Sequence, residues 1–166
     1  MKKFLSLFLV VLTCFMLVAC GESSTPAQGE SSSPTETDST AAENTGEGDL
    51  GDYHVRVTGY HLAKSYDDKD VIILDYEFTN NDEDATSAET ALYIKMFQDG
   101  IQLESAIVID DSYDSDNGFK DIKTGVTLPC QCAYELENTT SPVEVEISKL
   151  FSFSDATVTY VINLSE

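Results

Sequence analysis

Residues 71–79, Val-Ile-Ile-Leu-Asp-Tyr-Glu-Phe-Thr, are the stretch that decides the fold. Apolar and polar side chains alternate along it, so that one face carries Ile72, Leu74, Tyr76 and Phe78 and the other carries Asp75, Glu77 and Thr79. An alternation with period two is typical of a β-strand that buries one face. We therefore expect a strand here, with its apolar face against a core.

The same alternation recurs on both sides of this stretch. Further strands are predicted over 53–57, 92–97, 101–109, 126–136, 143–147 and 157–164. Asp99-Gly100 joins the second and third of these segments, and a dipeptide that tolerates positive φ between apolar runs predicts a tight hairpin. A helical turn is expected within 81–91 and an irregular crossover over 148–155.

About seven strands, separated by turns rich in Asp, Asn, Gly and Ser and without helical periodicity, predict an all-β domain. Two antiparallel sheets bury one face of each strand, so we expect an immunoglobulin-like antiparallel β-sandwich over 49–166. The chain contains no Trp, whereas an antibody-type domain has a core Trp and a widely spaced Cys pair. The prediction therefore concerns the architecture and not a true immunoglobulin domain.

The charge of the chain excludes one class of partner. Its 166 residues include 30 Asp and Glu against 9 Lys and Arg, which gives a formal net charge of −21. Binding to nucleic acid needs clustered Lys or Arg to displace counterions from phosphates, so no nucleic-acid role is expected. Anionic lipid headgroups should repel the same surface.

The amino-terminal residues have the pattern of an export signal. Lys2 and Lys3 precede a run over 4–19 that has no charged residue, which is short for a membrane span. The end of this run, Leu17-Val18-Ala19-Cys20, resembles the bacterial lipobox. We therefore expect a lipoprotein signal peptide over 1–19 and a covalent diacylglycerol on Cys20, which anchors the protein to the outer face of the cell membrane. An ordinary secretory signal and an uncleaved anchor helix are the alternatives.

Residues 20–48 have the composition of a tether. They are rich in Ser and Thr, contain several acids and no base, and have only alanines as aliphatic side chains beyond Cys20. Such a segment has little to bury against the entropy cost of ordering, so we expect it to be disordered and extended by its own charge.

Four phrases carry a resemblance to a known family: VIILDYEFTNND over 71–82, IKMFQDGIQLE over 94–104, IKTGVTLPCQCAYEL over 122–136 and SPVEVEISKLFSFSD over 141–155. With the lipobox leader and the acidic tether, they resemble a family of extracellular lipoprotein domains of Gram-positive bacteria. This family is a domain of unknown function, related to immunoglobulin-like secreted antigens. The resemblance covers about 52–164. It implies a sandwich fold and display at the cell surface, and it implies no catalytic residue.

Cys130 and Cys132 lie two residues apart on a predicted strand and therefore on the same, apolar face. They are small core side chains, a strained disulfide, or a thiol pair with redox or metal chemistry. An exported protein enters an oxidising compartment, so a disulfide between these two cysteines stays an alternative. His54 and His61 have an odd spacing, which predicts opposite faces of one strand, and nothing in the sequence places them beside the cysteines.

The acidic loops contain hard oxygen ligands of the class that calcium prefers. The best candidates lie over 110–118 and are Asp110, Asp111, Asp114 and Asp116. The segment does not have the spacing of an EF-hand. The alternative is a solvated acidic surface that keeps a displayed protein soluble.

No sequence motif indicates catalysis: there is no Gly-x-Ser-x-Gly, His-Glu-x-x-His or phosphate-binding loop. We therefore predict that the protein is not an enzyme but a cell-surface binding or adhesion module, whose partner is an extracellular or envelope protein. The alternatives are a structural or envelope-homeostasis lipoprotein without a tight ligand, and a calcium-stabilised domain that binds a solute or protein.

Overall fold

The computed structural model describes residues 45–109 and 111–164. The predicted signal peptide, Cys20 and most of the predicted tether lie outside the described residues. Within the described part, no helix is both long enough and apolar enough to cross a lipid bilayer.

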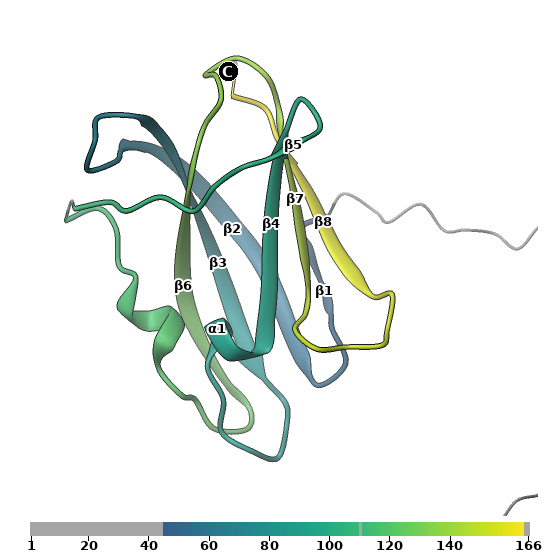
Figure 1. The fold of residues 1–166 in the computed structure, drawn as a ribbon. Helices are drawn as coiled ribbons and strands as arrows, with labels where there is room; N and C mark the ends of the chain where they lie inside the picture. Colours follow the sequence, from purple (N-terminus) through teal and green to yellow (C-terminus); the bar gives the residue numbers. More distant parts are fainter. Residues whose placement is uncertain (1–44, 110, 165–166) are drawn as a thin grey trace, which may run out of the picture. The chain divides into compact units, whose positions relative to one another are not determined.

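Eight strands form two antiparallel sheets of four, which face each other in Figure 1. In the order of the first sheet, its strands are β1 (Glu47–Asp49), β2 (Tyr53–Lys64), β3 (Asp70–Asn80) and β6 (Val126–Glu135). In the order of the second sheet, its strands are β5 (Ile101–Gln102), β4 (Leu92–Gln98), β7 (Val143–Lys149) and β8 (Thr157–Ile162). One helical turn, α1 (Ala88–Ala91), and one 3-10 turn, η1 (Asp116–Phe119), lie between strands. The predicted all-β sandwich is confirmed.

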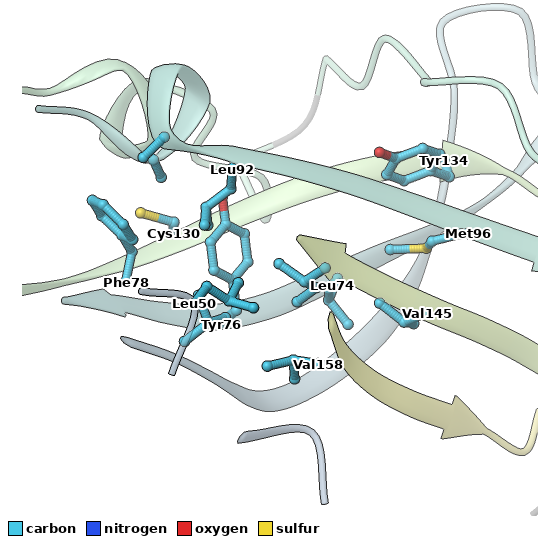
Figure 2. Close-up of a cluster of buried hydrophobic side chains, with 14 of the residues drawn as sticks. Leu50, Leu74, Tyr76, Phe78, Leu92, Met96, Cys130, Tyr134, Val145 and Val158 are labelled. Atoms are coloured by element: carbon cyan, nitrogen blue, oxygen red, sulfur yellow. The ribbon is translucent and has the colours of Figure 1, made fainter. Parts of the chain in front are cut away.

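Strand β3 builds the core as its alternation predicts. Ile72, Leu74, Tyr76 and Phe78 are buried, and they pack with inward side chains of the second sheet such as Met96 (Figure 2). Burying side chains of this size stabilises the fold by about 1.5–3 kcal/mol each. The pattern is equally regular in β7, where Val143, Val145 and Ile147 are all buried.

The hairpin at Asp99-Gly100 is confirmed, because both residues have positive φ, 53° and 79°, as a two-residue turn between paired strands requires. The strand predicted over 101–109 is wrong after Gln102. Leu103 N–H still donates to Met96 O of β4, and the chain then pairs with β6 instead, through Ala106 N–H to Ala133 O. It then wraps onto the outer face of the first sheet, where its side chains cover Val71 and Ile73.

The predicted placement of the two histidines on opposite faces is also wrong. A β-bulge between Val57 and Gly59 shifts the register of β2 against β3. His54 therefore pairs with Thr79 and His61 pairs with Ile73, two positions on the same face of β3. An extra residue in one strand reverses the sidedness of everything that follows it.

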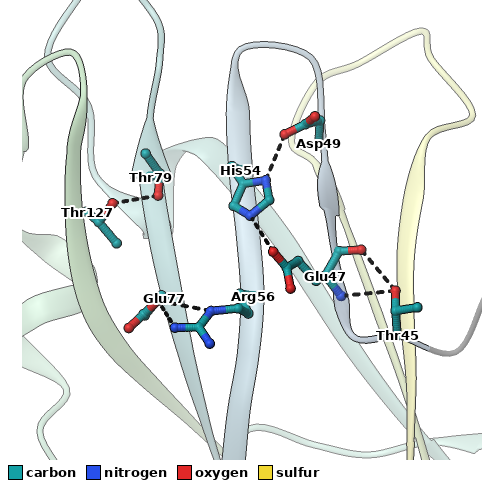
Figure 3. Close-up of polar contacts among 8 residues, drawn as sticks. All are labelled: Thr45, Glu47, Asp49, His54, Arg56, Glu77, Thr79 and Thr127. Atoms are coloured by element: carbon teal, nitrogen blue, oxygen red, sulfur yellow. Dashed lines mark hydrogen bonds and ion pairs between the residues drawn. The ribbon is translucent and has the colours of Figure 1, made fainter.

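Strand β1 lies across the predicted boundary at residues 48 and 49, so the sheet includes two residues that were assigned to the tether. His54 holds it through Asp49 Oδ1, 2.7 Å from Nδ1, and Glu47 Oε1, 3.3 Å from Nε2 (Figure 3). Gly46 N–H donates to Thr159 O, and a Cβ at Gly46 would lie 2.9 Å from the Tyr160 ring. The close approach of β1 to β8 closes one side of the sandwich.

Candidate functional site

The other side of the sandwich, between β4 and β6, is open. A cleft of about 710 Å³ lies there, bordered by α1, by the chain after β5 and by η1. Its lining is mixed, with five aromatic side chains and two carboxylates: Tyr76, Tyr93, Tyr113, Phe119, Tyr134, Glu89 and Glu104. A concave site with aromatic walls and few charged groups is the usual form of a binding site.

The cleft exists because β5 is only two residues long. It pairs only with Phe97 and Gln98 at the end of β4. The preceding part of β4 pairs with β7 on one edge, and its other edge has no strand beside it in the described part of the chain. Leu103 N–H donates to Met96 O and ends this contact, because the Leu103 side chain is buried in the core. At the other end of β4, the N–H of Leu92 caps α1 through Ala88 O.

One side chain bridges the open edge. Tyr134, on β6, donates its hydroxyl to the carbonyl of Ile94 on β4 over 2.7 Å. Further along β6, Glu135 N–H donates to Glu104 O, so the segment after β5 covers this end of its edge. Tyr134 therefore provides a hydrogen-bond donor for the Ile94 carbonyl at the open edge of β4.

The carboxylate of Glu89 acts on the whole cleft. Burial raises the pKa of Tyr113 and of Cys132, and the charge of Glu89 raises both further. Glu89 itself is exposed and forms no ion pair with Lys, Arg or His among residues 45–109 and 111–164. The cleft thus presents negative charge that the described residues do not neutralise.

Cys130 and Cys132 are free thiols in the structure. Cys130 is buried in the main core, and Cys132 is partly buried and lines the cleft. Burial raises the pKa of Cys130 to about 11, and Asp114 and Glu89 add to the effect. A thiol held protonated is a poor nucleophile, which favours the interpretation as core side chains.

The interpretation of Cys130 and Cys132 as protonated core side chains gives a direct expectation. At pH 8, iodoacetamide should modify neither cysteine of the folded protein over a time in which it modifies both in 6 M guanidinium chloride, because only the thiolate reacts. Intact mass before and after unfolding measures this. A protein that takes up no label even when unfolded, until a reductant is added, would contain the disulfide instead.

The predicted calcium residues are only partly brought together. Asp111 and Asp114 line a second hollow, of about 510 Å³, against the strands β3 and β6. Asp75, which no acidic-loop argument identified, lies in the same hollow and accepts a hydrogen bond of 2.6 Å from Gln131 Nε2. Gln131 Oε1 in turn accepts the N–H of Asp114.

Asp116 does not line this hollow; its N–H donates to Asp114 Oδ1 over 3.0 Å. Asp110 lies outside the described residues. Among the residues that the structure describes, no three His, Cys, Asp or Glu side chains gather closely enough to hold a metal ion.

Sequence reasoning missed the residues of the cleft. The sequence pattern places Tyr134 only within a predicted strand, 126–136, and Glu89 only within the segment 81–91, where a helical turn is expected. The sequence around neither residue indicates a cleft, because the cleft depends on how far β5 pairs with β4. The partial signal was Leu103, whose apolar side chain closely follows the hairpin.

Three comparisons place the chain among known proteins. No curated protein matches it. A protein of Bacillus subtilis described as a "putative lipoprotein (ycdA)" matches with a TM-score of 0.56 and 15% identity. The match covers 75% of this chain and 40% of the Bacillus subtilis chain. A protein of Enterococcus faecalis, solved by NMR, matches with a TM-score of 0.52 and 22% identity, over 71% of this chain and 89% of that one. At these identities the likeness shows the fold alone.

The match to a family model shows the family. The model described as "Domain of unknown function (DUF5067)" covers residues 28–149, well over half of the 166 residues. This range includes the whole of the open edge, from α1 through β4 to β6, and ends at the last residue of β7. The chain therefore belongs to the DUF5067 family, which agrees with the resemblance to a domain of unknown function that its sequence phrases carry.

Proposed function

We propose that the chain is a lipid-anchored domain on the outer face of the cell membrane of a Gram-positive bacterium, which binds an extracellular or envelope protein and catalyses no reaction. The observation that carries the proposal is the cleft between β4 and β6, with its aromatic walls and unneutralised carboxylates. The two facing antiparallel sheets support an immunoglobulin-like architecture for the domain.

The anchor and the location rest on the sequence. The lipobox at Cys20 and the charged, then apolar, leader support export and acylation, and the protein of Bacillus subtilis with a similar fold is described as a "putative lipoprotein". An acyl anchor needs no basic patch, which fits a chain of net charge −21. The same charge favours a partner that has a basic surface, because complementary charge speeds and orients association.

Site-specific photocross-linking on intact cells tests this function. A benzophenone amino acid replaces Tyr93, which is exposed and lines the cleft, and in a matched protein it replaces Val161, which is exposed on β8 at the other edge of the same sheet. We expect one discrete adduct from position 93 and not from position 161.

The same adduct should be lost when the cross-linker at 93 is combined with Glu89→Arg, which reverses the charge of the cleft. Equal adducts from both positions, or an adduct that is indifferent to Glu89→Arg, would contradict a binding cleft. The absence of any adduct would favour the structural or envelope-homeostasis alternative.

Calcium is the second candidate. Asp111 and Asp114 line one hollow with Asp75, and the three carboxylates would have to move closer together to share an ion. We expect a rise of several degrees in the thermal midpoint when the protein, in non-ionic detergent, is moved from chelator to millimolar calcium. Ligand at 100 times its Kd stabilises by about 2.7 kcal/mol. Asp114→Asn should abolish this rise, and Asp67→Asn, in another loop, should leave it unchanged. An equal rise with magnesium, or no rise, would show that these acids are solvated charge.

A further inference from the structure

We propose that the cleft receives an extended, positively charged peptide segment of the partner protein, which adds as a strand to the open edge of β4 and places a Lys or Arg against Glu89. This inference rests on the proposed function, because it names how and by what the cleft is occupied. Strand addition to an exposed edge is a general mode of peptide recognition, in which backbone hydrogen bonds give affinity and alternate side chains give specificity.

The direction of the backbone groups of β4 supports this occupant. Ala91 O accepts the N–H of Leu150 just beyond the carboxyl end of β7, so the odd-numbered residues at this end of β4 turn toward β7. Ile94 O and Met96 O accept from Tyr134 and Leu103 instead, so the even-numbered residues turn toward the cleft. In an extended strand the N–H and C=O of one residue point to the same side. The N–H of Ile94 therefore faces the cleft together with its carbonyl.

Tyr134 takes the place of a neighbouring strand at the open edge of β4. Its hydroxyl donates to Ile94 O, which is the bond that the N–H of an added strand would make. A side chain can turn away from a strand edge without breaking a sheet. The bond to Tyr134 thus protects the edge in the free protein and is exchanged when a peptide adds.

The charges of the cleft select a cationic segment. Glu89 on α1 and Glu104 after β5 both line the cleft, and neither forms an ion pair with a basic side chain of the described residues. Tyr113 and Phe119 line the same cleft and offer apolar and cation–π contacts to alternate side chains. An acidic strand would meet like charge at both carboxylates.

The test uses two labelled peptides and the full protein in non-ionic detergent. The first probe is Thr-Val-Lys-Val-Lys-Val-Thr, and the second has Glu in place of both Lys. We expect saturable binding of the Lys peptide, weaker by about tenfold or more for the Glu peptide, because its carboxylates would meet those of Glu89 and Glu104. Glu89→Gln should weaken the Lys peptide by about tenfold as well, whereas Glu83→Gln, an exposed acid that does not line the cleft, should not.

Strand addition has its own readout at Ile94. Hydrogen exchange of the Ile94 amide should slow when the Lys peptide is bound, because that N–H then donates to the peptide. Ile94→Pro removes this donor, which does not serve the β4–β7 ladder, and should abolish binding. Ile94→Ala keeps the donor and should retain most of it. Circular dichroism verifies that both variants are folded.

The outcomes separate this inference from the proposed function. If Ile94 exchange does not change, or Ile94→Pro binds as well as Ile94→Ala, strand addition is wrong. If lysine amide alone competes as well as the peptide, the cleft takes a small cation and strand addition is equally wrong. In either case a charge-dependent cross-link from position 93 would leave the proposed function standing.

Discussion

Replacing Gln98 by leucine is expected to lower the free energy of unfolding by about 3–5 kcal/mol, a large part of the total stability of a small domain. Gln98 is buried at the end of β4, and its amide makes four hydrogen bonds to backbone groups of the loop between β6 and β7. Nε2 donates to Asn138 O and Ser141 O, and Oε1 accepts from the N–H groups of Glu137 and Asn138. Leucine has nearly the same size but satisfies none of these groups.

Urea unfolding followed by circular dichroism measures the loss, since the chain has no Trp to report it. The matched control is Gln102→Leu, on the exposed strand β5, which should change stability by less than about 0.5 kcal/mol. If both substitutions cost the same small amount, the four bonds to Gln98 would be replaced by water and the loop would not depend on them.

The sequence alone predicts those parts of the fold that depend on the pattern of residues within a single strand or turn. Strands β3 and β7 alternate because one face meets the core, and the Asp99-Gly100 hairpin follows from two residues that accept positive φ. These properties are local, so no knowledge of neighbouring strands is needed. The all-β class follows from them directly.

The remaining features depend on contacts between distant segments. Val71 and Ile73 lie on the outer face of β3 and are apolar because Ala106, Val108 and Tyr113 pack against that face. The bulge before Gly59 is one inserted residue with no sequence mark of its own, yet it turns His61 to the face of His54.

The candidate sites divide in the same way. The acids of one loop, Asp111 and Asp114, could be grouped from the sequence because they are neighbours in the chain. Asp75 could not, because it joins their hollow only through the pairing of β3 with β6. The cleft is still harder to predict from the sequence, because it depends on the pairing of β5 with β4 ending after two residues. Gln98 is similar: a polar residue at the end of a strand usually indicates the surface, and only the loop between β6 and β7 explains its burial.

Replacing Cys20 by alanine is expected to move the exported protein from the membrane to the aqueous phase almost completely. Cys20 lies outside the described residues, and the prediction follows from the resemblance of residues 17–20 to a lipobox and from the energetics of acylation. Each buried methylene of an acyl chain contributes about 0.8 kcal/mol, and two chains are enough for stable anchoring. An acidic domain has no basic patch to replace them, so loss of the lipid should leave little residual affinity for an anionic membrane.

Phase partition in a detergent that separates on warming measures the anchor, with the wild type in the detergent phase and Cys20→Ala in the aqueous phase. Cys14→Ala is the matched control, because it removes the other leader cysteine from the same apolar run and should leave the protein in the detergent phase. If Cys20→Ala stays in the detergent phase with its leader attached, the apolar run is itself the anchor. The cleft between β4 and β6 would then still face outward, but the length of chain between it and the bilayer would be set by an uncut helix and not by an acylated amino terminus.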